Sequence, residues 1–211
     1  MKKKKGLLIS FEGGEGVGKT VQIKLLADVL RKQGRDVVIT REPGGTVISE
    51  KIRKILLDRE NIGMAFTTEV LLFQAARAQI YRELILPSLA AGKVVLCDRT
   101  RDSSVVYQGI VRDFGEKLIE SLHKISTKNT YPDVTILLDV PVKTGLARRN
   151  GTKKIDRLDI EKKDFHQKVR RGYLKLAKRN DRGRWILVDA SKSIEEVHEE
   201  VLEKLKEKRI F

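Results

Sequence analysis

Short runs of apolar residues alternate with longer amphipathic segments along the whole chain. The apolar runs have the length and composition of buried β-strands. We expect these strands at residues 7–11, 37–39, 94–97, 134–138 and 185–188. Because the runs are continuous rather than alternating, the pattern predicts an α/β fold with a five-stranded parallel sheet flanked by helices on both faces.

The segments between the runs carry apolar residues at the three- and four-residue spacing of amphipathic helices. The spacing predicts helices at residues 19–33, 48–57, 68–86, 165–176 and 194–205. Gly34 and Pro87 are expected to end the first and the third of them. Ligands of such sheets bind beyond the carboxyl ends of the strands, so we expect the functional residues there.

The composition narrows the class of protein. A chain of 211 residues suits one domain, and we expect residues 1–211 to form it. Cys97 is the only cysteine, which excludes an internal disulfide and a multi-cysteine metal site. The three histidines have no metal-ligand spacing. The apolar runs are too short to span a bilayer, so we expect a cytoplasmic protein without a membrane partner.

The charge is strongly basic, because 44 Lys and Arg against 29 Asp and Glu give a formal charge of +15. Residues 2–5 supply four of these charges, within a basic tail at residues 1–5, and residues 142–184 supply eleven. Taken alone, this excess predicts a polyanionic partner: nucleic acid, an anionic membrane or nucleotide phosphates. We expect the tail to be disordered and most charges beside the helix at 165–176 to form a solvated face.

A phosphate-binding loop is predicted between the first strand and the first helix. The pattern G-x-x-x-x-G-K-[ST] is matched by Gly13, Gly14, Glu15, Gly16, Val17, Gly18, Lys19 and Thr20. Glycines let backbone N–H groups converge on phosphate oxygens, and the helix N-terminus adds its dipole. Lys19 is expected to reach the β- and γ-phosphates of a nucleoside triphosphate, and the Thr20 hydroxyl to ligate Mg²⁺. An ordinary glycine-rich turn is the alternative interpretation.

Asp98 follows the apolar run at residues 94–97. In phosphate-loop enzymes an aspartate at such a strand end holds Mg²⁺, and we expect Asp98 to do so through water. A simple cap of the strand end is the alternative. Cys97 beside it is expected to be an inert, buried thiol.

Further motifs follow one another along the chain. They are residues 11–22, 40–46, 69–77, 98–104, 107–109, 131–133 and 156–157. Together they resemble the thymidylate kinase family, whose members phosphorylate dTMP with ATP, and they occur in the family's order over nearly the whole chain. The resemblance implies a P-loop fold of the nucleoside monophosphate kinase type, with a short mobile lid, and a homodimer.

The resemblance implies how the nucleoside part of dTMP is bound. Phe73 is expected to stack on the thymine ring, and Gln108 to bind the edge of the base. Arg77 is expected to contact both base and phosphate. Tyr107 is expected to pack against C2′ of the sugar, and Glu15 to accept a hydrogen bond from the 3′-hydroxyl. From helix periodicity alone, Phe73 would be a core residue and Arg77 a solvated one.

The resemblance also implies how the acceptor phosphate is bound. Arg53 and Arg99 are expected to hold it, because a guanidinium group suits bidentate contacts. Ser103 and Glu42 are expected to complete the acceptor site. Arg53 could equally belong to a charged helix face, and Glu42 to a turn.

The lid is expected at residues 148–158. Family members with glycine at the position of Gly16, where others carry arginine, tend to place catalytic arginines in this lid. Lys153 and Lys154 add further positive charge there. Cations that close over the phosphoryl group stabilise its charge and exclude water. The catalytic residues that the resemblance implies are Lys19, Arg99, Arg148, Arg149 and Arg157.

Several positions depart from the family's usual pattern, among them Val21, which stands where a second Thr or Ser often follows the lysine motif. Val106 stands where a small alanine usually precedes Tyr107, and we expect it to press on the nucleoside pocket. Thr100 replaces a common aromatic residue after Asp98 and Arg99. The strictness for dTMP over dUMP therefore stays open.

Two other functions also stay open. One is a related kinase with a different acceptor, such as dUMP or another nucleoside monophosphate. The other is a nucleic-acid-binding ATPase, which the charge and the phosphate loop favour but which lacks an RNP motif or a zinc finger. We expect ATP and dTMP, rather than nucleic acid, as partners.

Overall fold

The computed structural model describes residues 6–150 and 156–210, in which strands and helices alternate. The strands are β1 (Leu7–Glu12), β2 (Val37–Arg41), β3 (Val94–Asp98), β4 (Val134–Asp139) and β5 (Trp185–Asp189). The α-helices are α1 (Lys19–Lys32), α2 (Val47–Leu57), α3 (Phe66–Ile80), α4 (Leu86–Ala90), α5 (Arg101–Ser104), α6 (Glu116–Ser126), α7 (Val142–Asn150), α8 (Lys163–Arg179) and α9 (Ile194–Glu207). The remaining helical elements are η1 (Arg59–Asn61), η2 (Tyr81–Ile85), η3 (Val105–Val111) and η4 (Asp181–Gly183).

The described strands form one parallel sheet in the order β2-β3-β1-β4-β5, which confirms the predicted fold class. Phe11 of β1 pairs with Asp98 of β3, and Asp98 pairs with Arg41 of β2. The carboxyl ends of these three strands are therefore level. The loops that follow them meet at one edge, at the point where the strand order changes direction.

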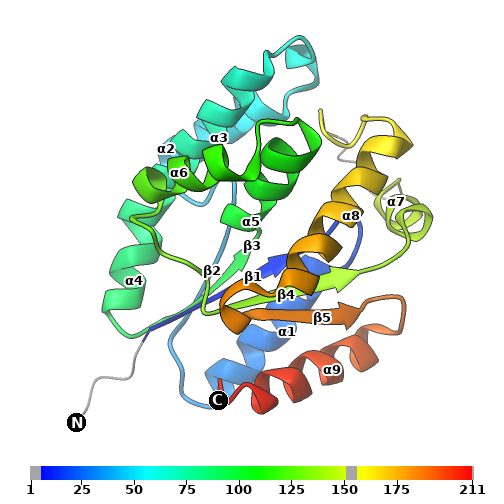
Figure 1. Cartoon of the computed structure of the whole chain (residues 1–211). Coiled ribbons are helices and arrows are strands. Elements are labelled where there is room, and N and C mark those ends of the chain that lie inside the picture. The colour runs from blue at the N-terminus through cyan, green and yellow to red at the C-terminus, as the bar shows by residue number, and fades with distance from the viewer. Residues whose placement is uncertain (1–5, 151–155, 211) are drawn as a thin grey trace.

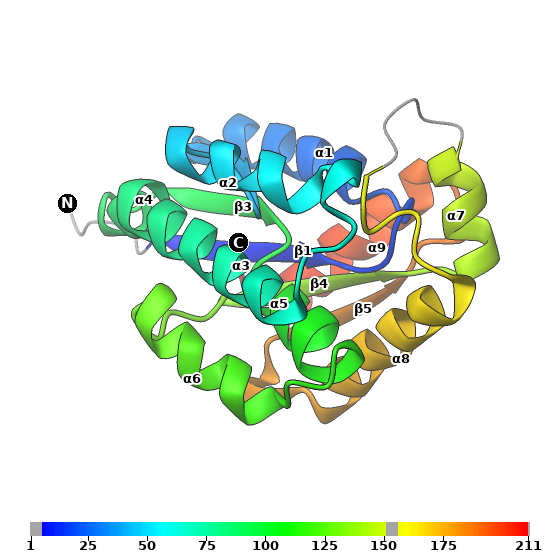
Figure 2. The same ribbon diagram turned by 90° about the horizontal axis from the view of Figure 1, so that it is seen from above.

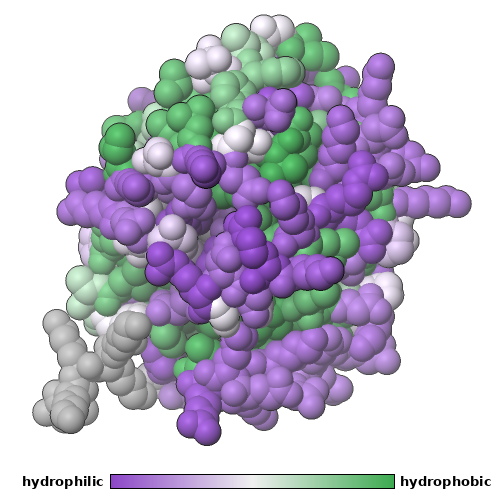
Figure 3. Space-filling view, viewed as in Figure 1, coloured by the Kyte–Doolittle hydropathy of each residue, from purple (hydrophilic) through white to green (hydrophobic). Residues whose placement is uncertain are grey.

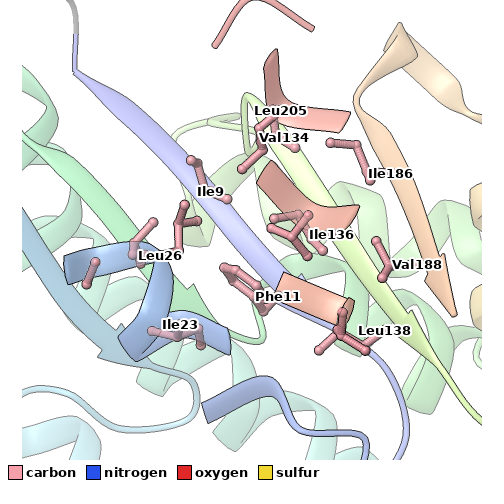
Figure 4. Packing of buried hydrophobic residues seen from close by; sticks show 14 of the residues in the cluster. Ile9, Phe11, Ile23, Leu26, Val134, Ile136, Leu138, Ile186, Val188 and Leu205 are labelled. Carbon is pink, nitrogen blue, oxygen red and sulfur yellow. The ribbon is translucent and has the colours of Figure 1, made fainter. Parts of the chain in front are cut away.

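Helices cover both faces of the sheet, with α1 and α9 below it and α3, α6 and α8 above it in Figure 1. Side chains alternate between the faces along each strand. Ile9 and Phe11 pack with residues of α1 and α9, as Figure 4 shows. Leu8 points to the opposite face and packs with Ile80 and Tyr81. The sheet is thus buried between two apolar layers, which holds its edge rigidly.

The helix predicted at residues 68–86 is longer and less regular than its pattern indicates. It passes through the π-helical turn η2 into α4, so the prediction that it ends near Pro87 is wrong. The N–H of Leu86 donates to the carbonyl of Tyr81, five residues earlier. Proline has no N–H to donate, and the wider turn just before it lets the chain continue in helical form.

Helix α7 lies at the end of the molecule toward which β4 runs, beside the loop that follows β1 (Figure 2). The predicted lid extends from this helix, and its residues 151–155, like the basic tail at 1–5, lie outside the described residues. In the part of the chain that the structure describes, no helix is both long and apolar enough to cross a membrane.

Candidate active site

A cleft of about 530 Å³ lies beyond the carboxyl ends of β1, β2 and β3. Its walls come from the glycine-rich loop after β1, from residues 41–43 after β2, and from residues 98–99 after β3. Helix α3, the π-helical segment η3 and α7 close its other sides. The sheet edge therefore brings together the segments that the sequence motifs mark, although they are far apart along the chain.

The glycine-rich loop has the conformation that its glycines permit. Gly16 and Gly18 have φ angles of 66° and 94°, in the left-handed region. Lys19 begins α1, is 8% exposed, and donates from Nζ to the carbonyl of Gly14 at 2.9 Å. Burial and the charge of Arg99 lower the pKa of its ammonium group. The loop therefore holds one amino group at the start of a helix, where backbone N–H groups also point outward.

The loop and α7 approach each other closely. A Cβ added at Gly16 would collide with the carbonyl of Gly145 in α7, and one added at Gly145 would collide with the carbonyl of Glu15. Only glycine at both positions permits this approach. The close contact brings the carboxyl-terminal end of α7, with Arg148 and Arg149, to the rim of the cleft.

Two oxygen ligands suitable for a magnesium ion lie side by side in the cleft. Thr20 Oγ1 donates to Asp98 Oδ2 at 3.1 Å. Oxygen donors of this kind suit Mg²⁺, which is often bound by one or two protein side chains together with phosphates and water. Within residues 6–150 and 156–210, no group of three His, Cys, Asp or Glu side chains forms a metal site. The residues present fit an ion that is held mainly by a nucleotide.

Glu12 lies beneath the cleft as a fully buried carboxylate. It accepts hydrogen bonds from the backbone N–H of Thr100 at 2.7 Å, from Ser103 Oγ at 2.6 Å and from the Tyr173 hydroxyl at 2.9 Å. Burial and the nearby charge of Asp102 raise its pKa. These bonds fix the chain from residue 99 to 103, which carries two predicted site residues.

Arg99 has a φ of 67°, which turns its side chain across the cleft toward the glycine-rich loop. Its guanidinium donates to Glu15 at 2.6 Å and to the Tyr173 hydroxyl at 2.9 Å. Burial alone would raise the pKa of Glu15, but the charges of Arg99, Lys19 and Arg149 outweigh it and lower this pKa to about 2. Tyr107 also donates to Glu15, at 3.2 Å. The described structure thus joins a carboxylate and an arginine that lie 84 residues apart.

The far side of the cleft is lined by Phe73, Arg77 and Gln108. Arg77 is 1% exposed, yet its guanidinium donates to Glu42 at 2.6 Å, to Ser104 at 2.8 Å and to the carbonyl of Thr100 at 3.1 Å. The interpretation of Arg77 as a solvated helix residue is therefore excluded. A planar ring, a fixed guanidinium and an amide together suit a flat heterocycle with polar edges.

Glu42 follows β2 and is 3% exposed. Burial raises its pKa to about 7, although the charge of Arg77 acts in the opposite direction. Its second oxygen, Oε1, has no hydrogen-bond partner among the described residues. Glu42 thus holds Arg77 in place through one oxygen, and its other oxygen, Oε1, can accept a hydrogen bond from a ligand.

Two further arginines line the cleft near residues 41–43. Arg53 donates to the carbonyl of Pro43 at 2.7 Å. Arg41, which was not predicted as a site residue, donates from Nη2 to both carboxylate oxygens of Glu50, at 2.8 and 2.9 Å. The position of Arg41 within the motif at residues 40–46 was the sequence feature that could have marked it as a site residue.

The three predicted lid arginines lie in different surroundings. Arg148 lines the cleft and donates to the carbonyl of Ala190 at 2.9 Å. Arg149 lines it too and donates to Asp159 at 2.6 Å. Arg157 is 4% exposed and lies behind the cleft wall, where it donates to Glu69 at 2.6 Å and to the carbonyl of Leu56 at 2.9 Å. In this structure Arg157 therefore anchors the chain that leaves the lid, and its catalytic role stays a prediction.

Comparison with known proteins connects this geometry with a family. Residues 11–201 match the family model described as Thymidylate kinase. A thymidylate kinase of Caldanaerobacter subterraneus subsp. tengcongensis is 46% identical over 203 residues, which cover 96% of both chains. A thymidylate kinase of Geotalea uraniireducens is 48% identical over 197 residues, which cover 90% of this chain and 92% of that protein.

A solved structure supports the same family. The crystal structure of thymidylate kinase from Ehrlichia chaffeensis superposes with a TM-score of 0.78 at 32% identity, covering 95% of this chain and 99% of that one. The chain belongs to the thymidylate kinase family. The resemblance inferred from the sequence motifs is thereby confirmed.

Most residues that the thymidylate kinase motifs mark come together in the cleft. Those that line it are Glu15, Gly16, Val17, Gly18, Lys19, Thr20, Glu42, Arg53, Phe73, Arg77, Asp98, Arg99, Ser103, Tyr107, Gln108, Arg148 and Arg149. Gly13 and Gly14 lie beside β4 instead, and their carbonyls accept from Lys19. The roles of all these residues stay predictions.

The expectation for Val106 is wrong. Val106 is fully buried and packs against α8, where a Cβ added at Gly172 would lie 2.9 Å from its Cγ1. The missing side chain of Gly172 provides the room that Val106 occupies. Its extra bulk is therefore directed away from the cleft, because η3 turns it to the opposite side from Gln108.

Tyr173 and Glu69 were missed as site residues. Tyr173 lies on the buried side of α8 and is 1% exposed, but its hydroxyl bonds Glu12 and Arg99 at the cleft. Glu69 is 1% exposed and bonds Gln108 and Arg157. The presence of Glu69 in the motif at residues 69–77 was the only signal for it.

Proposed function

We propose that this protein transfers the γ-phosphoryl group of ATP to dTMP, which yields ADP and dTDP. In the reaction a phosphate oxygen of dTMP forms a new bond to the γ-phosphorus, and the bond to the β,γ-bridging oxygen breaks. The observation that carries the proposal is one cleft with two ends. A phosphate-binding loop forms one end, and a pocket with an aromatic ring, an arginine and an amide forms the other.

The donor end suits a nucleoside triphosphate. The loop's N–H groups and the N-terminus of α1 favour phosphate oxygens, and Lys19 adds a positive charge at the same point. Thr20 and Asp98 would hold Mg²⁺. When bound, such an ion neutralises charge on the β- and γ-phosphates and orients them.

The acceptor end suits a pyrimidine monophosphate. Phe73 offers its ring for stacking, and Gln108 and Arg77 offer polar groups to the edge of the base. Tyr107 and Glu15, joined by a hydrogen bond of 3.2 Å, would face the sugar. Arg99 and Arg53 lie between the base pocket and the loop, where the acceptor phosphate would be.

Positive charge surrounds the point of transfer, where little covalent chemistry is needed from the protein. Lys19 lines the cleft from the glycine-rich loop, Arg99 bonds Glu15 of the same loop, and Arg148 and Arg149 line the cleft from α7. These cations would stabilise charge on the transferring group. Closure of the segment at residues 148–158 would exclude water and prevent hydrolysis of ATP.

We also propose that the protein is a homodimer that pairs through an apolar surface on α2, α3 and α6. Figure 3 shows hydrophobic surface toward the top of the molecule, where these helices lie. Its exposed members include Val47, Leu71, Leu118 and Ile125, which are between 48% and 74% exposed. Apolar surface of this kind marks contact sites. A cytoplasmic location stays a prediction.

A panel of acceptors tests the proposed reaction. ADP release would be measured with ATP, Mg²⁺ and each of dTMP, dUMP, UMP, CMP and AMP. The highest kcat/KM is expected with dTMP, and the Lys19→Ala variant should lose this activity while keeping its circular dichroism spectrum. A higher kcat/KM with CMP or AMP, or ADP release that depends on DNA, would contradict the proposal.

A further inference from the structure

We propose that Glu69 is the positioning residue that selects the base, because it holds the amide of Gln108 with its carbonyl oxygen toward the cleft. The inference rests on the proposed function, since it assumes that a pyrimidine lies between Phe73 and Gln108. It concerns a residue on α3 that itself does not line the cleft.

Glu69 is held from two sides. It is 1% exposed, and its Oε2 accepts from Arg157 at 2.6 Å and lies 3.6 Å from Arg112. Arg157 is itself held by the carbonyl of Leu56, and Arg112 by Glu161 at 2.6 Å. Two guanidinium groups beside one carboxylate oxygen fix the orientation of the Glu69 side chain.

The other oxygen of Glu69 determines how Gln108 is oriented. Gln108 is 1% exposed, and its Nε2 donates to Glu69 Oε1 at 3.0 Å. A carboxylate whose other oxygen accepts from an arginine acts as an acceptor, so the amide turns its NH₂ group toward it. In the described chain no group donates to Gln108 Oε1. The carbonyl oxygen is therefore left as an acceptor for a ligand.

An acceptor at this position discriminates between pyrimidines. Thymine and uracil carry an N–H at ring position 3, whereas the same ring atom of cytosine is itself an acceptor. Two acceptors that face each other in a buried site leave both unpaired, which is strongly unfavourable. Stacking on Phe73 cannot make this distinction, because every base has a π-face. Selection against cytosine is therefore assigned to the pair of Glu69 and Gln108.

The Glu69→Gln variant tests the inference. A glutamine at this position can present either an NH₂ group or a carbonyl, so the amide of Gln108 is free to reverse. We expect the ratio of kcat/KM for dTMP to that for dCMP to fall by about tenfold or more. Glu69→Asp keeps the negative charge and should recover part of the ratio. Glu200→Gln is the control, since Glu200 of α9 pairs only with Lys192 and Lys204 among the described residues, and its substitution should leave the ratio unchanged.

The outcomes separate the two proposals. If the wild-type protein turns over dTMP and Glu69→Gln lowers kcat/KM equally for dTMP and dCMP, Glu69 has only a structural role and the inference is wrong. Absence of dTMP turnover in the wild-type protein would instead overturn the proposed function.

A second measurement needs no variant and applies even if Glu69→Gln does not fold. Binding of dTMP, 3-methyl-dTMP and dCMP to the wild-type protein would be compared by calorimetry. A carbonyl that faces the base predicts at least about tenfold weaker binding of both analogues. Binding of dCMP as tight as that of dTMP would mean that the amide has the opposite orientation.

Discussion

The arginines of the cleft differ in how much of their hydrogen-bonding capacity the protein already uses. Arg77 is buried and donates to four groups, so it is fixed before any ligand arrives. Arg99 is shared between Glu15 and Tyr173. Among the described residues Arg53 donates to one backbone carbonyl, that of Pro43, which leaves it the most available of the three. A preorganised set of this kind loses little side-chain entropy when it binds a phosphate.

The pairing of Glu15 and Arg99 predicts a specific pH dependence of stability. The pKa of Glu15 is about 2 in the folded protein and close to 4.5 in the unfolded chain. Because the pKa of Glu15 is lower in the folded protein, its ionised carboxylate stabilises the folded state above pH 4.5, by up to about 3 kcal/mol. This stabilisation is lost as the pH falls toward 2 and the carboxylate is protonated. Urea unfolding of Glu15→Gln should therefore show a deficit against the wild type that is largest at pH 5 and narrows toward pH 2.5. A deficit that stays constant over this range would contradict the assigned pKa.

Substitution of Phe73 is expected to weaken the binding of dTMP without changing the binding of ATP. Phe73→Leu keeps an apolar side chain of similar size, so the protein should lose less than about 1.5 kcal/mol of stability. Loss of the stacked ring should weaken dTMP binding by about tenfold to a hundredfold. Calorimetry with dTMP and with ATP checks this, because ATP binding should not change. Phe114→Leu, in a neighbouring apolar cluster, is the matched control and should leave both affinities unchanged.

At the scale of elements, the site depends on two local features of the backbone, a π-helical segment and a close contact between two glycines. The π-helical segment η3 directs Tyr107 and Gln108 toward the cleft and Val106 toward α8. The glycine pair at Gly16 and Gly145 lets α7 approach the phosphate loop. The first feature sets the direction in which side chains point, and the second sets how closely α7 approaches the loop.

Gly145→Ala tests the contact between α7 and the loop. Its Cβ would collide with the carbonyl of Glu15, so α7 must move away and carry Arg148 and Arg149 with it. We expect kcat to fall by about tenfold to a hundredfold, since misplacement by about 1 Å can cost this much. Steady-state kinetics with Gly63→Ala gives the control, because a Cβ there meets open space. Unchanged kcat in Gly145→Ala would show that this contact does not position the arginines.

These elements also show what the sequence could predict. The strands were predicted correctly because five continuous apolar runs are a local signal. The π-helical turn η2 could not be predicted, because a proline normally ends a helix. The hydrogen bond between residues five apart that accommodates this proline has no sequence signature. Glu69 and Tyr173 were missed for a related reason: their helices could be predicted, but not the partners that their polar atoms reach across the fold.

For the whole molecule, the charge of +15 is a poor guide to the partner. Several of the described basic residues between 142 and 184 are engaged in ion pairs. These pairs join Arg149 with Asp159, Arg157 with Glu69, Arg170 with Asp139, Arg179 with Glu116, and Arg184 with Asp102. The charges beside α8 are mainly exposed, at Lys162, Lys163, Arg171, Lys175, Lys178 and Arg179, which confirms the expected solvated face. The family to which the chain belongs, rather than its charge, indicates the class of partner.

The apolar surface on α2, α3 and α6 predicts the behaviour of the whole protein in solution. Replacing Leu71 and Ile125 together by glutamate places two charges on exposed apolar positions, where folding should tolerate them. We expect the mass measured by light scattering to change from that of a dimer to that of a monomer. A double substitution on α9, Glu199→Gln with Glu203→Gln, should leave the dimer intact. A wild-type protein that is already monomeric would contradict the proposed pairing.

The most direct test of the central claim follows the phosphoryl group itself. The protein would be incubated with Mg²⁺, dTMP and ATP labelled in its γ-phosphate, and the nucleotides would then be separated. The account predicts that the label appears in dTDP, in proportion to the ADP formed, and that it does not in the folded Lys19→Ala variant. Label found mainly as free phosphate, or transferred to dTMP equally well without Lys19, would contradict the account.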